Sequence, residues 1–391
     1  MQSTDRDNFF ETDDQVAQRE RKAAKASNKH GNPISLKSKI LAAVLDPASP
    51  SSTIFVAESA GYVRRLNLKT SEPTATYKGP KAPVTCLAVG GKGASTIFAG
   101  SWDKDIWSWD IESSAPGRKY SGHSDFVKAL ISTTLSGKEI LISGGADKKI
   151  FIWDVETGKR LHTLQDPTTT MLAVQHLAID LVLSTPDAVV FASASSDPHI
   201  RRWKITLDSS EQLPELFSDH PDTERLTIQE HDTSIYRLVY DNTSDQGDLW
   251  TASADGTTKC LSRSRNFVAD ETLQHGDYVR AVVVTEAWAI TAGRNEDIKV
   301  WDRSTGKLHA TIEGHFEEVT DLVLLQGGGG IPDRVCSVSI DRTVRVWPLA
   351  RGELDEVIKK IKEPPKKEEE KASGGMMTAE EEAELAELMD D

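Results

Sequence analysis

The segment GADKKIFIWD, residues 145–154, decides the fold of this chain, because five other segments end in the same way. The six segments are SWDKDIWSWD (101–110), GADKKIFIWD (145–154), SSDPHIRRWK (195–204), SADGTTKCLS (253–262), GRNEDIKVWD (293–302) and SIDRTVRVWP (339–348). Their last large residues are Trp109, Trp153, Trp203, Leu261, Trp301 and Trp347, 40 to 58 residues apart, and a fainter copy, ESAGYVRRLN (58–67), places Leu66 upstream of them. A self-similar unit of roughly 40–45 residues, built of short β-runs, predicts the blades of a β-propeller.

The third unit shows most clearly how each repeat divides into strands. Its four β-runs cover residues 127–131 (strand a), 139–143 (b), 150–153 (c) and 160–164 (d). Seven units of this kind tile the chain from about residue 39 to residue 350. Seven four-stranded blades close into a ring, and closure hides the sheet edges that would otherwise aggregate. The sequence therefore predicts an all-β, seven-bladed propeller.

The seventh unit lacks a convincing strand d, since PLARGELDEVIKKI follows Trp347. Either the run at 34–36, ahead of the first blade, supplies this strand and latches the ring shut, or a C-terminal strand or helix at 353–361 does so. The sequence favours the N-terminal run, because it leads directly into the first strand a. Two segments, 208–223 and 326–330, lengthen turns of the fourth and seventh units, and we expect both to be tolerated loop insertions.

Composition narrows the class of protein. The formal net charge is −15, from 46 Lys and Arg against 61 Asp and Glu, which argues against broad nucleic-acid binding. The three cysteines, Cys86, Cys260 and Cys336, are single and far apart, so they predict reduced core residues rather than a disulfide framework or a metal site. Neither a signal peptide nor an apolar run of 18 residues is evident, so we expect no membrane contact and a cytoplasmic or nuclear location.

The two ends of the chain differ from the repeats. Residues 1–32 are polar and predict a disordered extension or a short helix, and residues 351–375 are charged and predict a solvated linker. The last segment, 376–391, carries seven acidic residues and no basic ones. Leu385, Leu388 and Met389 fall on one face of a possible helix, so this segment is expected to fold only against a partner.

Over residues 33–350 the chain resembles the WD40-repeat propellers. The resemblance implies that each blade carries a buried His, Ser or Thr, Asp and Trp in one hydrogen-bonded chain. The third unit matches with His123, Ser143, Asp147 and Trp153, and the seventh with His315, Ser337, Asp341 and Trp347. The sixth has His275, Thr291 and Trp301 with Asn295 in place of the acid, and the fifth has His231, Thr251 and Asp255 with Leu261 in place of the Trp. The fourth keeps Ser193, Asp197 and Trp203 without a His, the second keeps Asp103 and Trp109 with Ala99, and the first has essentially none of the pattern.

A His, a Ser and an Asp in one repeat also suggest a catalytic triad. A catalytic group occurs once and faces a cleft, whereas this set recurs at the blade period, so a structural network is the better interpretation. The glycine-rich stretch VGGKGAST (89–96) lacks the spacing of a phosphate-binding loop. We therefore expect neither an enzyme nor a cofactor.

The resemblance also implies which side chains face a partner. In WD40 propellers, the loops that join strand d to a and strand b to c share the face most often used for binding. The side chains projected there are Trp102, Phe126, Lys128, Tyr236, Tyr278, Arg280, Arg294 and Phe316, and Trp102 is expected to neighbour Phe126. Aromatic and basic side chains on an acidic protein suggest a partner segment with acidic and apolar character.

The sequence therefore predicts a scaffold that binds an intracellular protein or peptide partner, within a multiprotein complex, on a propeller that is itself monomeric. Two alternatives remain open. One is a substrate receptor of a ubiquitin ligase, although the tetrapeptides WDIE, WDVE and WDRS do not fit the Trp-Asp-x-Arg pattern of such receptors. The other is a non-catalytic subunit of an enzyme complex, such as a methyltransferase, or an assembly chaperone for a basic protein.

Overall fold

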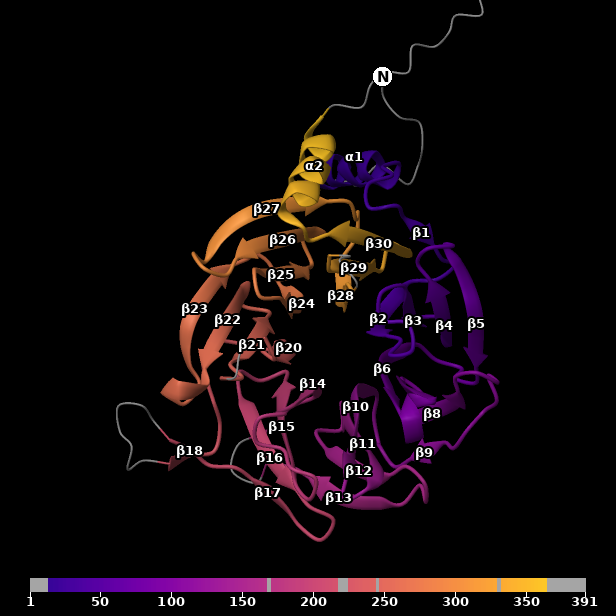
Figure 1. Cartoon of the computed structure of the whole chain (residues 1–391), viewed down its shortest axis with the longest axis vertical. Coiled ribbons are helices and arrows are strands. Elements are labelled where there is room, and N and C mark those ends of the chain that lie inside the picture. The colour runs from indigo at the N-terminus through magenta and orange to yellow at the C-terminus, as the bar shows by residue number, and fades with distance from the viewer. Residues whose placement is uncertain (1–12, 167–169, 217–223, 244–245, 329–331, 364–391) are drawn as a thin grey trace, which may run out of the picture.

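The computed structural model describes residues 13–166, 170–216, 224–243, 246–328 and 332–363. Within these residues, seven four-stranded antiparallel sheets stand around a central axis (Figure 1). The predicted propeller is confirmed. The strands of the third unit lie where the sequence placed them, and strand a runs four residues further than predicted, to Leu135.

The strand bounds are as follows. Blade one has β2 (Ile40–Leu45), β3 (Thr53–Glu58), β4 (Tyr62–Asn67) and β5 (Glu72–Lys78), and blade two has β6 (Val84–Gly90), β7 (Thr96–Ser101), β8 (Asp105–Asp110) and β9 (Tyr120–Ser121). Blade three has β10 (Val127–Leu135), β11 (Lys138–Gly145), β12 (Ile150–Asp154) and β13 (Arg160–Leu164), and blade four has β14 (Val174–Ile179), β15 (Val189–Ser195), β16 (Ile200–Ile205) and β17 (Ser210–Gln212). Blade five has β20 (Ile235–Tyr240), β21 (Leu249–Ser253), β22 (Thr257–Ser262) and β23 (Val268–Gln274), and blade six has β24 (Val279–Val284), β25 (Trp288–Gly293), β26 (Asp297–Asp302) and β27 (Lys307–Glu313). Blade seven has β28 (Val319–Leu325), β29 (Arg334–Ser339) and β30 (Thr343–Pro348), with β1 (Ile34–Ser35) as its outer strand.

The N-terminal strand closes the ring. Ile34 pairs with Val344 and Ser35 with Thr343 in antiparallel register, and the N–H of Leu36 donates to the carbonyl of Arg342 at 2.8 Å. The predicted N-terminal latch is therefore confirmed, and the alternative closure by residues 353–361 is wrong. Because the outer strand of blade seven comes from the other end of the chain, opening the ring requires these pairings to break.

Residues 351–362 are not a solvated linker, which corrects the sequence-based interpretation. They form helix α2 (Arg351–Lys362), and Leu354 is fully buried among apolar residues of blades six and seven. Val357, Ile358 and Ile361 pack against the same cluster. These four residues are three or four positions apart and therefore form one apolar stripe along the helix. The many charged residues between them led the sequence analysis to predict a linker instead of a docked helix. The rest of the predicted linker beyond residue 363, and the segment 376–391, lie outside the described residues.

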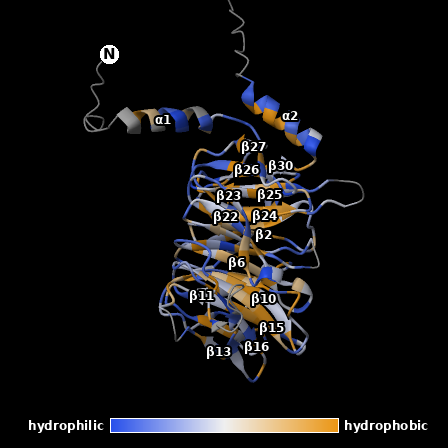
Figure 2. Ribbon diagram, turned by 90° about the vertical axis from the view of Figure 1, so that its left-hand side faces the viewer, coloured by the Kyte–Doolittle hydropathy of each residue, from blue (hydrophilic) through white to orange (hydrophobic). Residues whose placement is uncertain are grey.

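A second helix, α1 (Asp13–Ala26), lies within the polar N-terminal extension. Figure 2 shows α1 and α2 at the same end of the molecule, beyond blade seven and on opposite sides of the disc. The contacts of α1 are ionic: Arg21 lies 2.8 Å from Glu296, and Lys22 lies 2.9 Å from Glu317. Among the described residues, no helix is long and apolar enough to cross a membrane.

The hydrophobic core lies between neighbouring blades. One cluster joins Phe55 of blade one to Trp109 of blade two, and another joins Ile142 of blade three to Phe191 of blade four. Each sheet is covered on both faces, so the middle strands are buried along their whole length, as in β15. This explains why the strands lack the apolar and polar alternation of a sheet with one wet face.

Every described inner strand carries a bulge at its second residue. The register shifts fall between Ile40 and Ala42, Val84 and Cys86, Val127 and Ala129, Val174 and His176, Ile235 and Arg237, Val279 and Ala281, and Val319 and Asp321. A bulge leaves one residue unpaired and re-aims its side chain. The bulged residues therefore lie outside the strand pairing, at the place where the inner strands border the central channel.

Candidate functional site

Blade three contains a chain of buried polar side chains drawn from four parts of the repeat, with Ser143 of β11 at its centre. His123 Nδ1 lies 3.0 Å from both carboxylate oxygens of Asp147, and its Nε2 lies 2.8 Å from Ser143 Oγ. Trp153 Nε1 donates to the same Oγ at 2.9 Å. The chain of hydrogen bonds thus fastens the loop before β10, strand β11, the turn after it and strand β12 to one another.

The same arrangement recurs around the ring with substitutions. In blade seven, His315 joins Asp341 (2.8 Å) and Ser337 (2.8 Å), and Trp347 Nε1 donates to Ser337 (2.9 Å). In blade five, His231 joins Asp255 (2.7 Å) and Thr251 (2.7 Å), and in blade six, His275 joins Thr291 (2.9 Å) and Asn295 (3.0 Å), with Trp301 donating to Thr291 (2.8 Å).

Burial opposes the ionisation of Asp147 and Asp341, yet the hydrogen bond and charge of the histidine outweigh it, and the pKa of each carboxyl lies below its usual range. Burial lowers the pKa of His315, against the opposing effect of Asp341. These side chains are enclosed and mutually satisfied, and they repeat around the ring. Their arrangement serves the architecture rather than an acyl-transfer reaction.

Blade four replaces the missing histidine with an arginine, which the sequence analysis did not identify. Arg201 is fully buried in β16, and its guanidinium contacts Asp166 (2.6 Å), Asp197 (3.1 Å) and Ser195 (3.2 Å). Two carboxylates balance the buried cation and satisfy several of its donors, as burial requires. Trp203 still donates to Ser193 at 2.8 Å, so half of the usual hydrogen-bond chain is retained.

Blade two is rearranged because Ala99 has no hydroxyl. Trp109 Nε1 donates instead to the carbonyl of Lys78 at 3.2 Å, in the preceding blade. Asp103 receives its hydrogen bond from Trp107 Nε1 at 2.9 Å. The two residues that the sequence assigned to one network, Asp103 and Trp109, are therefore not joined by a hydrogen bond through Ala99.

Two of the residues predicted to face a partner form one exposed aromatic pair. Trp102, in the turn between β7 and β8, stacks on Phe126, in the loop before β10, with ring centroids 4.8 Å apart and an interplanar angle of 14°. Trp102 is 43% exposed and Phe126 37%. The pairing joins blades two and three, and it places a flat apolar surface at the mouth of the central channel.

Tyr278 and Arg294 make a second exposed pair on blade six. Tyr278 is 42% exposed, and the guanidinium of Arg294 lies 5.1 Å from the centre of its ring. The N–H of Arg294 donates to the carbonyl of Tyr278 at 3.0 Å, which holds the two loops together. Phe316 lies on the loop between blades six and seven, is half-buried, and donates its N–H to Asp341 at 3.3 Å.

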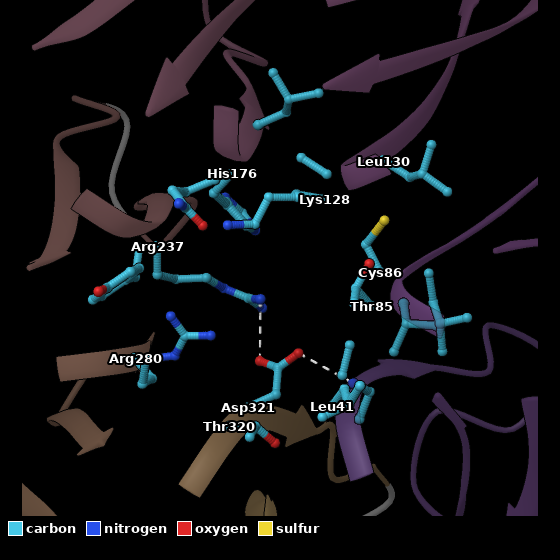
Figure 3. A pocket seen from close by; sticks show the side chains of 18 of the residues that line it. Leu41, Thr85, Cys86, Lys128, Leu130, His176, Arg237, Arg280, Thr320 and Asp321 are labelled. Atoms are coloured by element: carbon cyan, nitrogen blue, oxygen red, sulfur yellow. Dashed lines mark hydrogen bonds and ion pairs between the residues drawn. The ribbon is translucent and has the colours of Figure 1, made fainter. Parts of the chain in front are cut away.

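The remaining three predicted residues, Lys128, Tyr236 and Arg280, line the central channel. Figure 3 labels Lys128 and Arg280. All three residues are half-buried, and all three are bulged residues of inner strands. Arg280 lies 4.3 Å from the centre of the Tyr236 ring and forms an ion pair with Glu318 at 3.0 Å. The eight predicted residues thus separate into an exposed rim and a channel lining.

The channel has a volume of about 420 Å³ and is lined by the inner strands of blades one to seven. Next to the bulged residues, its wall includes Arg237, His176 and Asp321, which the sequence analysis did not select. Arg237 pairs with Asp321 at 3.1 Å, and the N–H of Ala43 donates to the same carboxylate at 3.2 Å. Arg237, His176 and Asp321 each directly follow the bulged residue of their strand. The bulges are visible only in the strand pairing of the structure, so the sequence alone carried no signal for these residues.

Burial and the neighbouring arginines lower the pKa values of two side chains in the channel. Burial, and then the nearby Arg280, lower the pKa of Lys128. Burial, and then Arg237, place the pKa of His176 well below its usual range. The N–H of Leu238 donates to His176 Nδ1 at 3.3 Å, so the ring is neutral and its proton lies on Nε2.

No group of three or more His, Cys, Asp or Glu side chains with a metal-binding arrangement occurs in the part of the chain that the structure describes. Cys86 lies in the channel wall, where burial raises the pKa of its thiol to about 12. Such a thiol is protonated at neutral pH and is a poor nucleophile.

Comparisons with known proteins agree with this architecture. The sequence pattern of the WD domain, G-beta repeat, matches residues 71–110 and 306–348, and that of the tRNA methyltransferase TRM82 WD40 domain matches residues 119–236. An uncharacterized WD repeat-containing protein of Schizosaccharomyces pombe is 30% identical over 401 residues, covering 100% of both chains. The nuclear distribution protein PAC1 of Coccidioides posadasii is 28% identical over 69% of this chain and 58% of its own length. The nuclear distribution protein nudF of Aspergillus niger is 27% identical over 71% of this chain and 52% of its own length.

Proteins built on this repeat are generally non-catalytic and serve in protein interactions. The repeats, the closed ring and the full-length relative lead to one conclusion: the chain belongs to the family of WD40-repeat β-propellers.

Proposed function

We propose that this protein is a non-enzymatic scaffold that holds a protein or peptide partner over the mouth of its channel. The observation that most strongly supports this proposal is the exposed stack of Trp102 on Phe126. Large aromatic side chains in water are unfavourable unless a partner covers them, and they are enriched among the residues that dominate binding energies. Because the rings are 43% and 37% exposed, covering the remaining area supplies about 1 kcal/mol for each ring.

The surrounding charges support the same proposal. The rim and channel contribute Arg294, Lys128 and Arg280, whereas the whole chain carries a formal net charge of −15. A basic and aromatic surface on an acidic protein favours a segment that carries both apolar and acidic side chains. Charge complementarity then orients the segment, and the rings supply most of the affinity.

A double variant tests the proposal. Trp102→Ala with Phe126→Ala removes the stack, and partners captured by the wild-type protein should bind at least about tenfold more weakly. The matched control is Leu181→Ala with Leu183→Ala, because these side chains are 62% and 46% exposed on the turn between β14 and β15, on the opposite face. Partner retention by the first variant would reject the proposal, and loss of the partner from the control alone would show that the opposite face binds instead.

A second candidate is favoured by one comparison. The match to the tRNA methyltransferase TRM82 WD40 domain spans residues 119–236, from just before β9 to the start of β20. It supports the proposal that this chain is the non-catalytic subunit of a methyltransferase complex. Affinity purification should then recover a chain with methyltransferase activity, and removal of this protein from its source cells should reduce tRNA methylation measured by mass spectrometry. Unchanged methylation, together with purified complexes free of any methyltransferase, would reject it.

A further inference from the structure

We infer that the channel mouth binds a single carboxylate, supplied by a glutamate or aspartate side chain of the docked partner segment. The inference rests on the proposed function and specifies the chemistry of the partner that this face takes. It depends on four residues of the channel wall: Lys128 of β10, His176 of β14, Arg237 of β20 and Arg280 of β24.

The inner-strand bulges bring these side chains to one place. Lys128 and Arg280 occupy bulged positions, and His176 and Arg237 follow the bulges of their own strands. Figure 3 shows Lys128, Arg237 and Arg280 extending toward the same part of the channel, with His176 beside Lys128. A cluster of donors from four blades is a rigid feature, because each strand is held by its own sheet.

The channel side chains differ in whether they already have an ion-pair partner. Arg237 is paired with Asp321, and Arg280 is paired with Glu318 through its Nε. The Nζ of Lys128 makes no hydrogen bond or ion pair with any residue that the structure describes. The carboxylate of Asp125, which accepts the N–H of Phe126 at 2.8 Å, acts on Lys128 through space and opposes the fall in its pKa. An acceptor in the channel would therefore meet a cation that lacks a partner.

His176 adds a neutral donor. Its Nδ1 accepts the N–H of Leu238, so only Nε2 carries a proton. Burial, and then the positive charge of Arg237, place the pKa of His176 well below the usual range, so the ring stays neutral at neutral pH. A neutral N–H beside an ammonium group stabilises an anion without adding further charge.

The balance of charge favours a carboxylate over a phosphate. Three cations line this part of the channel, and two carboxylates, Asp321 and Glu318, already pair with two of them. Asp125 of the preceding loop acts on Lys128 through space but forms no ion pair with it, so Lys128 is the one cation of the three without a paired carboxylate, and a monoanion would pair with it. A phosphate group would bring about −1.5 to −2 charges at neutral pH and leave an excess of negative charge. The volume of about 420 Å³ lies in the range of small-molecule sites and accommodates a side chain.

A titration with a small carboxylate tests the site without any partner. The probe is N-acetyl-glutamate methylamide, which has one carboxylate, and its control is the uncharged glutamine counterpart. The signal of Lys128, labelled with nitrogen-15 at Nζ and assigned with Lys128→Arg, should shift with the glutamate probe alone, and the pKa of Lys128 should rise by about 1. The Lys138 signal, from the opposite face, should not move.

Three outcomes would overturn the inference: equal shifts with both probes, no shift with either, or a larger shift with inorganic phosphate at the same concentration. The last would assign the site to a phosphate group. Because the titration uses no partner, its failure leaves the aromatic rim untouched as a docking surface.

The link to the partner is tested separately with Lys128→Gln. Partner binding should weaken by about tenfold, with a shallower dependence on salt, while the melting temperature stays unchanged. Lys119→Gln is the matched control, because Lys119 pairs with Asp105 outside the channel. Unchanged affinity of Lys128→Gln would show that the partner does not use the channel, even if the rim variant loses binding.

Discussion

Blades three and six form the same chain of hydrogen bonds, but the histidine faces a carboxylate in blade three and a neutral amide in blade six. In blade three, His123 Nδ1 faces the carboxylate of Asp147, whereas in blade six His275 uses Nε2 to contact the neutral amide oxygen of Asn295. Burial lowers the pKa of His275 to about 4, against the opposing hydrogen bond of Asn295. The comparison teaches that the hydrogen-bond chain is retained when its charge is lost, so the geometry of the repeat matters more than ionisation.

The largest expected effect comes from removing the histidine of each blade. His123→Ala removes the side-chain partner of the buried Asp147 carboxylate, which keeps the N–H groups of Ser124 and Lys149 as donors, and we expect a loss of about 3 kcal/mol in the free energy of unfolding. His275→Ala removes one partner from a neutral amide, whose oxygen still accepts the N–H of Asp297 at 3.4 Å, and should cost less, about 2 kcal/mol. Urea unfolding followed by tryptophan fluorescence measures both. Equal losses would show that the charge of Asp147 is immaterial.

The next effect concerns pH. The unfolded chain protonates His275 near pH 6.5 and the folded chain near 4, so the unfolded state binds more protons between these values. Stability therefore falls as the pH is lowered, by about 2 kcal/mol from this group between pH 8 and pH 5. His176 and His315 act in the same direction, because their pKa values are also lowered.

Asn295→Asp isolates the contribution of His275 to this loss. A carboxylate at that position should raise the pKa of His275 and reduce the wild-type loss by about 1 kcal/mol or more, measured by urea unfolding at pH 8 and pH 5. His176 and His315 remain unchanged in the variant, so they cancel in the difference. Identical pH profiles for the two proteins would contradict the assignment.

Smaller losses are expected at the shared hydroxyl. Ser143→Ala and Thr291→Val each remove the acceptor of a tryptophan N–H and the partner of a histidine, in blades three and six respectively. Each should cost about 1–2 kcal/mol, and about equally, because each hydroxyl joins one histidine to one tryptophan. Ser193→Ala, in a blade without the histidine, should cost about half as much. Unequal losses in blades three and six would mean that their difference extends beyond Asn295.

The smallest effect lies at the turn that follows the acid position. The left-handed residue of this turn is Lys148 in blade three and Glu296 in blade six, with φ of 66° and 71°. Lys25 of α1 lies 3.3 Å from Glu296, so the helix is placed by a charge that blade three lacks. Lys25→Ala should lower stability by less than about 1 kcal/mol, and the difference should vanish in 1 M salt. A loss that persists in salt would mean that α1 docks by apolar contact.

Much of this protein could be predicted from its sequence because the repeat encodes local partners. Trp153, Ser143 and His123 recur at fixed spacing, and the pairing of Trp102 with Phe126 follows from the adjacency of successive blades. The latch of Ile34 on Val344 followed from the missing last strand. In each case, the interacting residues occupy positions that every blade repeats.

Other features depended on departures from the repeat. Arg201 replaces a histidine by reaching Asp166, 35 positions earlier, and no spacing rule relates the two. Helix α2 was concealed by its charged composition, because its four apolar residues gain their meaning only against the surface of blades six and seven. The contacts of Arg201 and of helix α2 both join residues far apart in the sequence, and the repeat pattern does not encode such contacts.

By itself, the sequence determined the number of blades, their strands and the residues on the rim, because these follow from local periodicity repeated around a ring. Only the tertiary structure decided the content of the channel. Bulges in separate strands bring Lys128, His176, Arg237 and Arg280 together, although they are spread over more than 150 residues. Their charges interact through space across the axis, where sequence separation carries no information about distance.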